Sequence, residues 1–133
     1  MRVYLDGRFL DRADARLSVD DRGFLFGDGI YEVARAIDGR LVEAERHLAR
    51  LVRGAAALRL ATPPAAEWRA VWEALLDANA LRTGEAVVYC QITRGAAPRA
   101  HPFPAADVPA THWAFAQRLA PPDALRATGA AAV

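Results

Sequence analysis

The spacing of apolar residues changes at Ala44, and this change constrains the fold more than any other feature of the sequence. Before Ala44, apolar and polar residues alternate in two segments, and each segment is interrupted by an Asp-Gly pair, Asp6-Gly7 or Asp38-Gly39. Alternation indicates strands with one buried face, and Asp-Gly is typical of two-residue hairpin turns. Residues 1–42 therefore predict two β-hairpins.

After Ala44, apolar residues recur every three or four positions, the spacing of one face of an α-helix. This spacing predicts a helix from Ala44 to about Leu60 and a second helix that follows Thr62-Pro63-Pro64. We expect Thr62 to cap the second helix, because a threonine hydroxyl accepts from free backbone N–H groups and proline is tolerated in a first turn. The apolar stripe of this helix consists of Trp68, Val71, Trp72, Leu75 and Leu76.

Two more strands are expected after the helices, at Ala86–Thr93 and His112–Leu119, with a long Pro- and Ala-rich loop, Arg94–Pro109, between them. Asp20–Gly29, rich in glycine and aspartate, is expected to be an ordered loop. Strands on both sides of a helix pair predict an α+β domain, in which an antiparallel sheet built from hairpins is covered on one side by two helices.

The domain boundary is expected near residue 120. Residues 1–119 are predicted to form one small α+β domain, and residues 120–128, which begin Ala-Pro-Pro, to form a linker. The apolar tail, residues 129–133, is interpreted as the start of a C-terminal domain that the sequence cuts off.

Composition argues against several partners. A formal charge of +1 gives no electrostatic reason to bind nucleic acid or an anionic membrane, and no apolar run approaches the ~20 residues of a membrane span. The single cysteine, Cys90, cannot form an internal disulfide, and the three histidines have no metal-ligand spacing. We therefore expect a cytoplasmic protein without a metal site.

All 17 basic residues are arginine, and the sequence contains no lysine. A lysine amine is the side chain that forms a Schiff base with a carbonyl cofactor. These 133 residues therefore cannot supply that reaction.

Candidate binding residues lie beside the predicted turns. Tyr31 begins a strand just after Gly29, where its hydroxyl could project from a sheet end, although a half-buried sheet tyrosine is the simpler interpretation. His47 and Arg50 lie one helical turn apart, and Gly54 beyond them would leave room for a ligand. The simpler interpretation of Arg50 is an exposed arginine.

The long loop offers Arg94, Arg99 and His101, three nitrogen-bearing side chains within eight residues. The planar fork of arginine can bind both oxygens of a carboxylate. A solvated surface loop is the alternative interpretation.

Three segments, taken in order, resemble the pyridoxal-phosphate enzymes of fold type IV. They are DRGFLFGDGIYEV (21–33), EAERHLARL (43–51) and ITRGAAPRAHPFP (92–104). This family includes D-amino-acid aminotransferases, branched-chain aminotransferases and aminodeoxychorismate lyases. The Arg-Ala-His sequence at 99–101 most resembles the D-amino-acid aminotransferases.

The resemblance implies roles for five residues. Tyr31, Arg99 and His101 would hold the substrate carboxylate, and the loop that carries Arg99 and His101 would reach into the neighbouring subunit of a homodimer. Arg50 would bind the phosphate of pyridoxal phosphate, and His47 would support Arg50.

In this family the lysine that binds the cofactor belongs to a second, C-terminal domain, and no catalytic residue is identified within residues 1–133. The chain is therefore expected to be inactive alone and to form the small domain of an enzyme that acts on D-amino acids and 2-oxo acids. The alternatives are the small domain of a branched-chain aminotransferase or of an aminodeoxychorismate lyase, or a non-catalytic dimerising or carboxylate-binding module.

Overall fold

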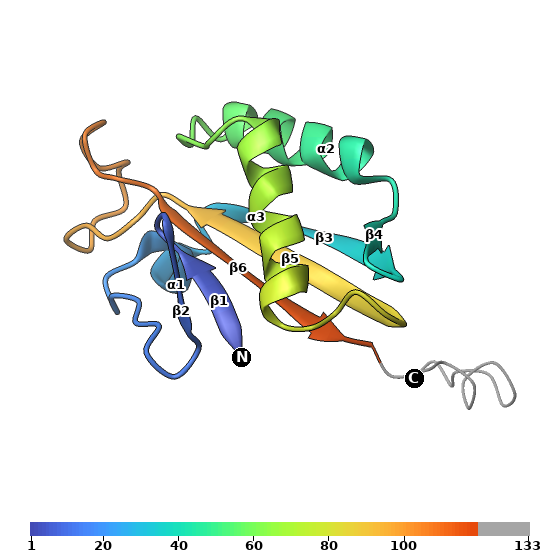
Figure 1. The fold of residues 1–133 in the computed structure, drawn as a ribbon. Coiled ribbons are helices and arrows are strands. Elements are labelled where there is room, and N and C mark those ends of the chain that lie inside the picture. Colours follow the sequence, from blue (N-terminus) through green and yellow to red (C-terminus); the bar gives the residue numbers. More distant parts are fainter. Residues whose placement is uncertain (120–133) are drawn as a thin grey trace, which may run out of the picture.

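The structure, a computed structural model, describes residues 1–119 (Figure 1). The linker and the C-terminal segment expected from the sequence, residues 120–128 and 129–133, lie outside the described residues.

A six-stranded antiparallel sheet forms the base of the domain, in the order β2-β1-β6-β5-β3-β4. The two predicted hairpins are present, and both Asp-Gly turns have positive φ angles. The strands are β1 (Arg2–Leu5), β2 (Arg8–Asp11), β3 (Gly29–Ile37), β4 (Arg40–Leu41), β5 (Glu85–Thr93) and β6 (Thr111–Arg118).

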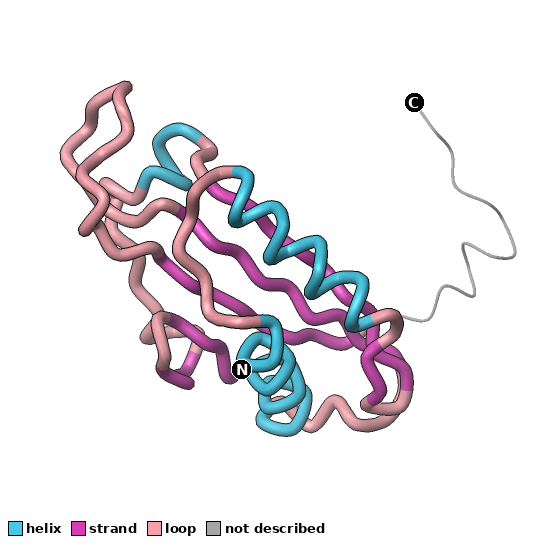
Figure 2. The backbone as a smooth tube through the Cα atoms, turned by 90° about the horizontal axis from the view of Figure 1, so that it is seen from above, coloured by secondary structure: helices cyan, strands magenta, loops and turns pink. Residues whose placement is uncertain are grey.

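Two helices, α2 (Ala44–Ala57) and α3 (Ala65–Ala78), cover one face of the sheet (Figures 1 and 2). The α+β fold with two helices on one side is thus confirmed. None of the helices within residues 1–119 is long and apolar enough to cross a membrane.

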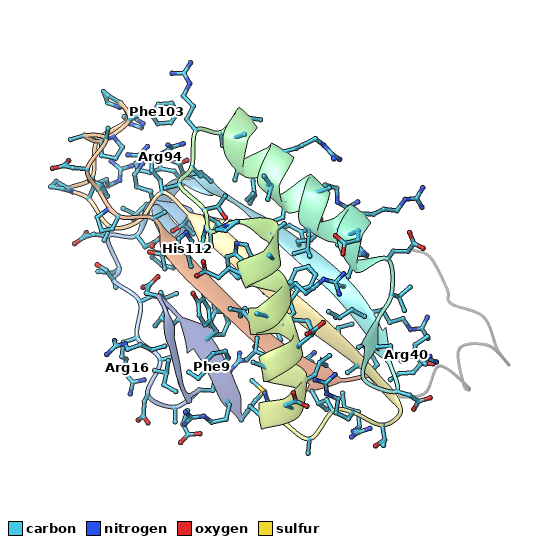
Figure 3. All side chains as sticks on the ribbon, turned by 45° about the horizontal axis from the view of Figure 1, so that its top comes forward. Phe9, Arg16, Arg40, Arg94, Phe103 and His112 are labelled. Carbon is cyan, nitrogen blue, oxygen red and sulfur yellow. The ribbon has the colours of Figure 1, made fainter. Side chains whose placement is uncertain are left out.

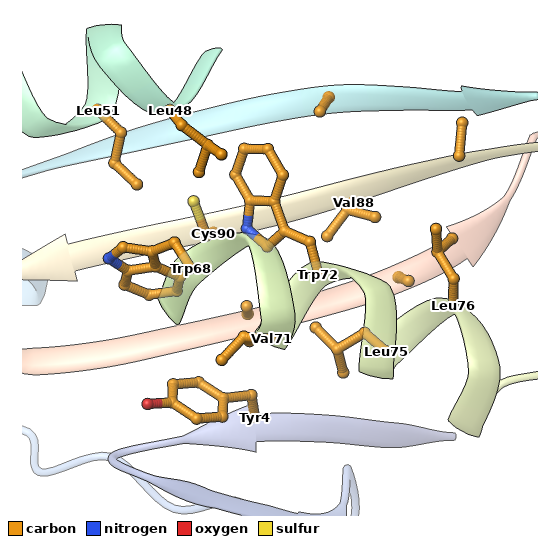
Figure 4. Packing of buried hydrophobic residues seen from close by; sticks show 14 of the residues in the cluster. Tyr4, Leu48, Leu51, Trp68, Val71, Trp72, Leu75, Leu76, Val88 and Cys90 are labelled. Carbon is orange, nitrogen blue, oxygen red and sulfur yellow. The ribbon is translucent and has the colours of Figure 1, made fainter. Parts of the chain in front are cut away.

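The main core lies between the two helices and the sheet (Figure 4). Trp68 and Trp72 of α3 are almost completely buried there, as the helical stripe predicted. Cys90 projects from β5 into the same core, and its burial raises the pKa of the thiol to about 12. The cysteine is therefore an inert packing residue, in agreement with its position in an apolar strand.

Alternation along β3 separates the two faces of the sheet. Glu32, Ala34 and Ala36 are buried on the helix side, whereas Tyr31 and Val33 lie on the opposite face, where Tyr31 is 67% exposed. On that open face the ring of Tyr31 stacks on Tyr89, with 5.7 Å between ring centroids. The interpretation of Tyr31 as a half-buried tyrosine is therefore wrong.

Two local predictions need correction. The segment Asp20–Gly29 contains a short helix, α1 (Arg22–Phe26), because the Asp21 carboxylate accepts from the Gly23 N–H and Gly27 adopts a left-handed conformation that ends the helix. Thr62 does not cap α3; its hydroxyl accepts from Trp68 Nε1 at 2.9 Å, and Pro64 occupies the capping position without a side-chain hydrogen bond.

β3 and β5 lie so close together at Gly29 that a larger residue there should destabilise the protein. A Cβ atom at this position would lie 2.6 Å from the backbone oxygen of Ile92, which cannot move without disturbing the strand pair. We expect Gly29→Ala to lower the free energy of unfolding by about 1–3 kcal/mol, measured by urea denaturation.

The matched control is Gly54→Ala in α2, whose added Cβ would lie 3.4 Å from the flexible end of Ile30. Because alanine favours helix by about 0.5–1 kcal/mol over glycine, this variant should be as stable as the wild type or more stable. Equal effects of the two substitutions would contradict the argument.

Candidate active site

A buried carboxylate on β3 organises the first part of the site. The Glu32 side chain is 3% exposed, and its two oxygens accept from Arg50 Nε and Nη2 of α2, both at 2.6 Å. His47 Nδ1, one turn earlier on the same helix, lies 3.0 Å from Glu32 Oε1. The carboxylate therefore fixes the guanidinium plane of Arg50, whereas the Arg50 side chain stays 66% exposed.

The charges of this group stabilise one another. Burial alone would raise the pKa of Glu32, but the hydrogen bonds from Arg50 and His47 outweigh burial, and the net pKa lies below its ordinary value. The hydrogen bond to Glu32 raises the pKa of Arg50, and Tyr31 adds a small contribution of the same sign. Tyr31 itself projects from the opposite face of β3, and no hydrogen bond joins it to Arg50 within residues 1–119.

Gly54 has a different role from the one predicted. Its missing side chain faces Ile30 of β3 at ordinary contact distance. The space beside Gly54 is therefore bounded by the Ile30 side chain of β3 rather than left open for a ligand.

Arg99 and His101, in the loop that follows β5, both contact the ring of Phe26 in α1. The Arg99 guanidinium carbon lies 5.3 Å from the ring centroid of Phe26, and the His101 ring lies 5.7 Å from it. Both side chains are exposed. No hydrogen bond, ion pair or ring contact joins either residue to Tyr31 within residues 1–119.

Two other arginines hold the base of this loop through Asp28. Arg22 Nε and Arg94 Nε both donate to Asp28 Oδ2 at 2.8 Å, and all three side chains are largely buried. Burial would raise the pKa of Asp28, but the two arginines hold it below its ordinary value. Arg94 also packs on the ring of Phe103, and Figure 3 shows the two together at the end of the sheet.

Arg94 is thus a structural residue. Its Nη2 donates to the Leu58 backbone oxygen at 2.8 Å, so its donors are used to tie the loop to the end of α2. Of the three nitrogen-bearing loop residues, Arg99 and His101 remain exposed and accessible to a ligand.

Larger solved chains contain a region with the same fold. A fold IV-transaminase structure from Curtobacterium pusillum is 28% identical, with a TM-score of 0.75 over 90% of this chain and 39% of that one. The structure of 4-amino-4-deoxychorismate lyase from Pseudomonas aeruginosa is 32% identical, with a TM-score of 0.69 over 87% of this chain and 39% of that one.

Sequence comparison gives the same assignment. The model of the amino-transferase class IV family matches residues 29–132. D-alanine aminotransferase of Staphylococcus haemolyticus is 40% identical over 117 residues, which are 87% of this chain and 41% of that protein. D-alanine aminotransferase of Listeria innocua is 41% identical over 78% of this chain and 36% of its own length.

The chain belongs to the amino-transferase class IV family, as the three sequence segments predicted. It spans about two fifths of the length of the D-alanine aminotransferases that it matches.

Sequence reasoning missed Glu32, Arg22 and Asp28. A signal for Glu32 was present, since it shares the inward parity of Ala34 and Ala36 on an alternating strand, and a charged residue at an inward position needs a partner. Arg22 and Asp28 gave no comparable signal, because their pairing depends on the path of the loop.

Glu32 should make stability depend on pH. Because its pKa is lower in the folded protein than the ordinary 4.5, the folded state binds fewer protons than the unfolded state around that pH. The free energy of unfolding should therefore fall as the pH drops through about 4.5 and below. Glu32→Gln should be less stable near neutral pH and lose less stability on acidification, as measured by urea denaturation at several pH values.

The control for this experiment is Glu85→Gln, which removes the carboxylate of a partly exposed pair with Arg35. Surface pairs contribute little to stability, so this variant should follow the wild-type pH dependence. If the free energy of unfolding of Glu32→Gln fell with pH as steeply as that of the wild type, the role given to the Glu32 carboxylate would be contradicted.

Proposed function

We propose that the complete protein to which this chain belongs transfers an amino group between a D-amino acid and a 2-oxo acid. The observation that carries the proposal is Arg50, an exposed guanidinium held in one orientation by the buried Glu32 carboxylate. Relatives at about 40% identity that are D-alanine aminotransferases support this choice of substrate.

The cofactor proposed for this site is pyridoxal phosphate. Arg50 fits a phosphate, because Glu32 accepts from its Nε and Nη2, the side chain is 66% exposed, and no hydrogen bond within residues 1–119 uses its Nη1. His47, on the same carboxylate, limits the rotation of Arg50. When bound, pyridoxal phosphate supplies an electron sink for bond cleavage at the substrate α-carbon.

The substrate carboxylate is the proposed ligand of Tyr31, Arg99 and His101. Arg99 can offer two parallel donors, and the exposed Tyr31 hydroxyl, on the residue before Glu32 in β3, can add another. Because Arg99 and His101 project from an exposed loop without contact to Tyr31, we propose that the loop completes the site of a second subunit in a homodimer.

The Schiff-base lysine must come from outside residues 1–133, since these contain none. We therefore propose that this chain binds and orients, and that it is inactive by itself. A lyase acting on 4-amino-4-deoxychorismate is the second candidate, because a structure with that function is 32% identical to this chain.

A panel of D-alanine, L-leucine and 4-amino-4-deoxychorismate tests the proposal on the complete protein loaded with pyridoxal phosphate. D-alanine should be the preferred amino donor with a 2-oxo acid acceptor. Preference for L-leucine or for the chorismate derivative would replace the proposed substrate class with that of the corresponding relative.

Arg50→Ala should weaken cofactor retention more than it changes substrate choice. Loss of charge-assisted hydrogen bonds to a phosphate should lower cofactor affinity roughly ten- to a hundredfold. Cofactor absorbance during dialysis measures the loss, and Arg53→Ala, an exposed arginine one turn further along α2, is the control. Unchanged retention with altered substrate preference would remove Arg50 from the phosphate site.

Arg99→Ala should raise the KM for amino acids strongly. Removing the arginine from a desolvated arginine–carboxylate pair typically weakens binding of the carboxylate by about 2–5 kcal/mol. A primary amine without a carboxylate should be affected far less, because the loop has nothing to bind. Steady-state kinetics with D-alanine and with such an amine make the comparison, and equal losses on both would return the loop to a structural role.

A further inference from the structure

The loop of Arg99 and His101 has few apolar contacts to hold it in one shape. Residues 98–103 are exposed, and they lie between Ala97, which is buried, and Pro104, which is partly buried. An exposed loop of this kind ordinarily samples several conformations. A carboxylate clamp needs the opposite, since its donors must be held close to the productive geometry before the ligand arrives.

One side chain from outside the loop, Arg22, binds the loop backbone directly on both sides of His101. Arg22 Nη1 donates to the backbone oxygen of Ala100 at 2.7 Å and lies 3.3 Å from that of Pro102. These carbonyls stand immediately before and after His101, and the first belongs to the residue that follows Arg99. Arg22 is 78 residues from Ala100 in the sequence, so the contact fixes a position that local turn chemistry does not.

Arg22 is itself buried and held by two residues of its own segment, Asp28 and Phe26. Its Nε donates to Asp28 Oδ2 at 2.8 Å, its side chain is 4% exposed, and its guanidinium carbon lies 4.6 Å from the ring centroid of Phe26. The same ring contacts Arg99 and His101. A buried, anchored guanidinium thus holds the backbone of the loop, and Phe26 holds its two side chains.

We infer that Arg22 is a positioning residue for the substrate carboxylate: it sets the loop so that Arg99 and His101 are presented together. This inference rests on the proposed function of these two residues. We expect no contact between Arg22 and the substrate, because the Arg22 side chain is only 4% exposed and its Nε and Nη1 donate to Asp28 and to the loop carbonyls.

The test uses Arg22→Gln and Arg22→Lys in the complete protein loaded with pyridoxal phosphate. Glutamine removes the charge and the fork. Lysine keeps the charge beside Asp28 but cannot reach Asp28 and two carbonyls at once, and it is the variant to use if glutamine prevents folding. Arg82→Gln is the control, since Arg82 also joins a carboxylate, Asp77, to a backbone oxygen, that of Gly39, at the far turn of β3.

In the kinetic measurement, both Arg22 variants should raise the KM for D-alanine roughly tenfold or more with a smaller change in kcat. The KM for an amine without a carboxylate should stay within about twofold of the wild type, and Arg82→Gln should resemble the wild type for both substrates. Equal losses on both substrates, as general structural damage would give, would overturn the inference.

A second measurement is independent of activity. An arginine-specific protease should cut between Arg99 and Ala100 faster in the Arg22 variants than in the wild type and in Arg82→Gln, with the site identified by mass spectrometry. Unchanged cleavage would show that Arg22 does not hold the loop and would overturn the inference. A wild type that transaminates no amino acid would instead refute the proposed function, while the cleavage rates would still decide whether Arg22 positions the loop.

Discussion

The pairing of β3 with β5 is the constraint on which the other features depend. Nine residue pairs hold the two strands in one register, from Gly29 opposite Thr93 to Ile37 opposite Glu85. A shift by one residue would exchange the faces, placing Glu32 on the open side and Tyr31 beneath α2. Gly29 permits the close approach at the Thr93 end of this pairing, and the loop of Arg99 and His101 leaves β5 at that same end. The register therefore fixes where both halves of the candidate site begin.

Buried carboxylates carry the next level of organisation. Glu32 binds Arg50, and Asp28 binds Arg22 and Arg94, so each carboxylate orients one or two guanidinium groups. Such pairs contribute less to net stability than their short distances suggest, because removing the charges from water offsets much of their attraction. Their main effect is geometric, since a bidentate or shared carboxylate leaves an arginine few orientations. A binding surface for anions needs this property.

Much of this arrangement could be predicted from the sequence, because the spacing of apolar residues along the chain indicates strands and helices locally. The two hairpins, the helix pair and the Trp68 stripe follow from spacing alone, and helical spacing also brought His47 next to Arg50. Glu32 could have been found from its parity on β3. The hold of Arg22 on Ala100 could not, because nothing local relates residues so far apart in sequence. The role of Thr62 was misjudged for a related reason, since Trp68 competes for its hydroxyl.

The exclusive use of arginine has different meanings at different positions. At exposed sites such as Arg46 and Arg53, a lysine would serve equally well, and the composition there reflects no structural need. At Arg22 and Arg50 the planar fork is required, because one group must meet both oxygens of Glu32 or, in the other case, Asp28 and backbone carbonyls. A lysine ammonium has three donors on one atom but no planar fork, so it cannot bind both oxygens of a carboxylate with two parallel hydrogen bonds. Residues 1–133 thus carry fixed guanidinium groups of the kind that suit anion binding, and they contain no lysine amine.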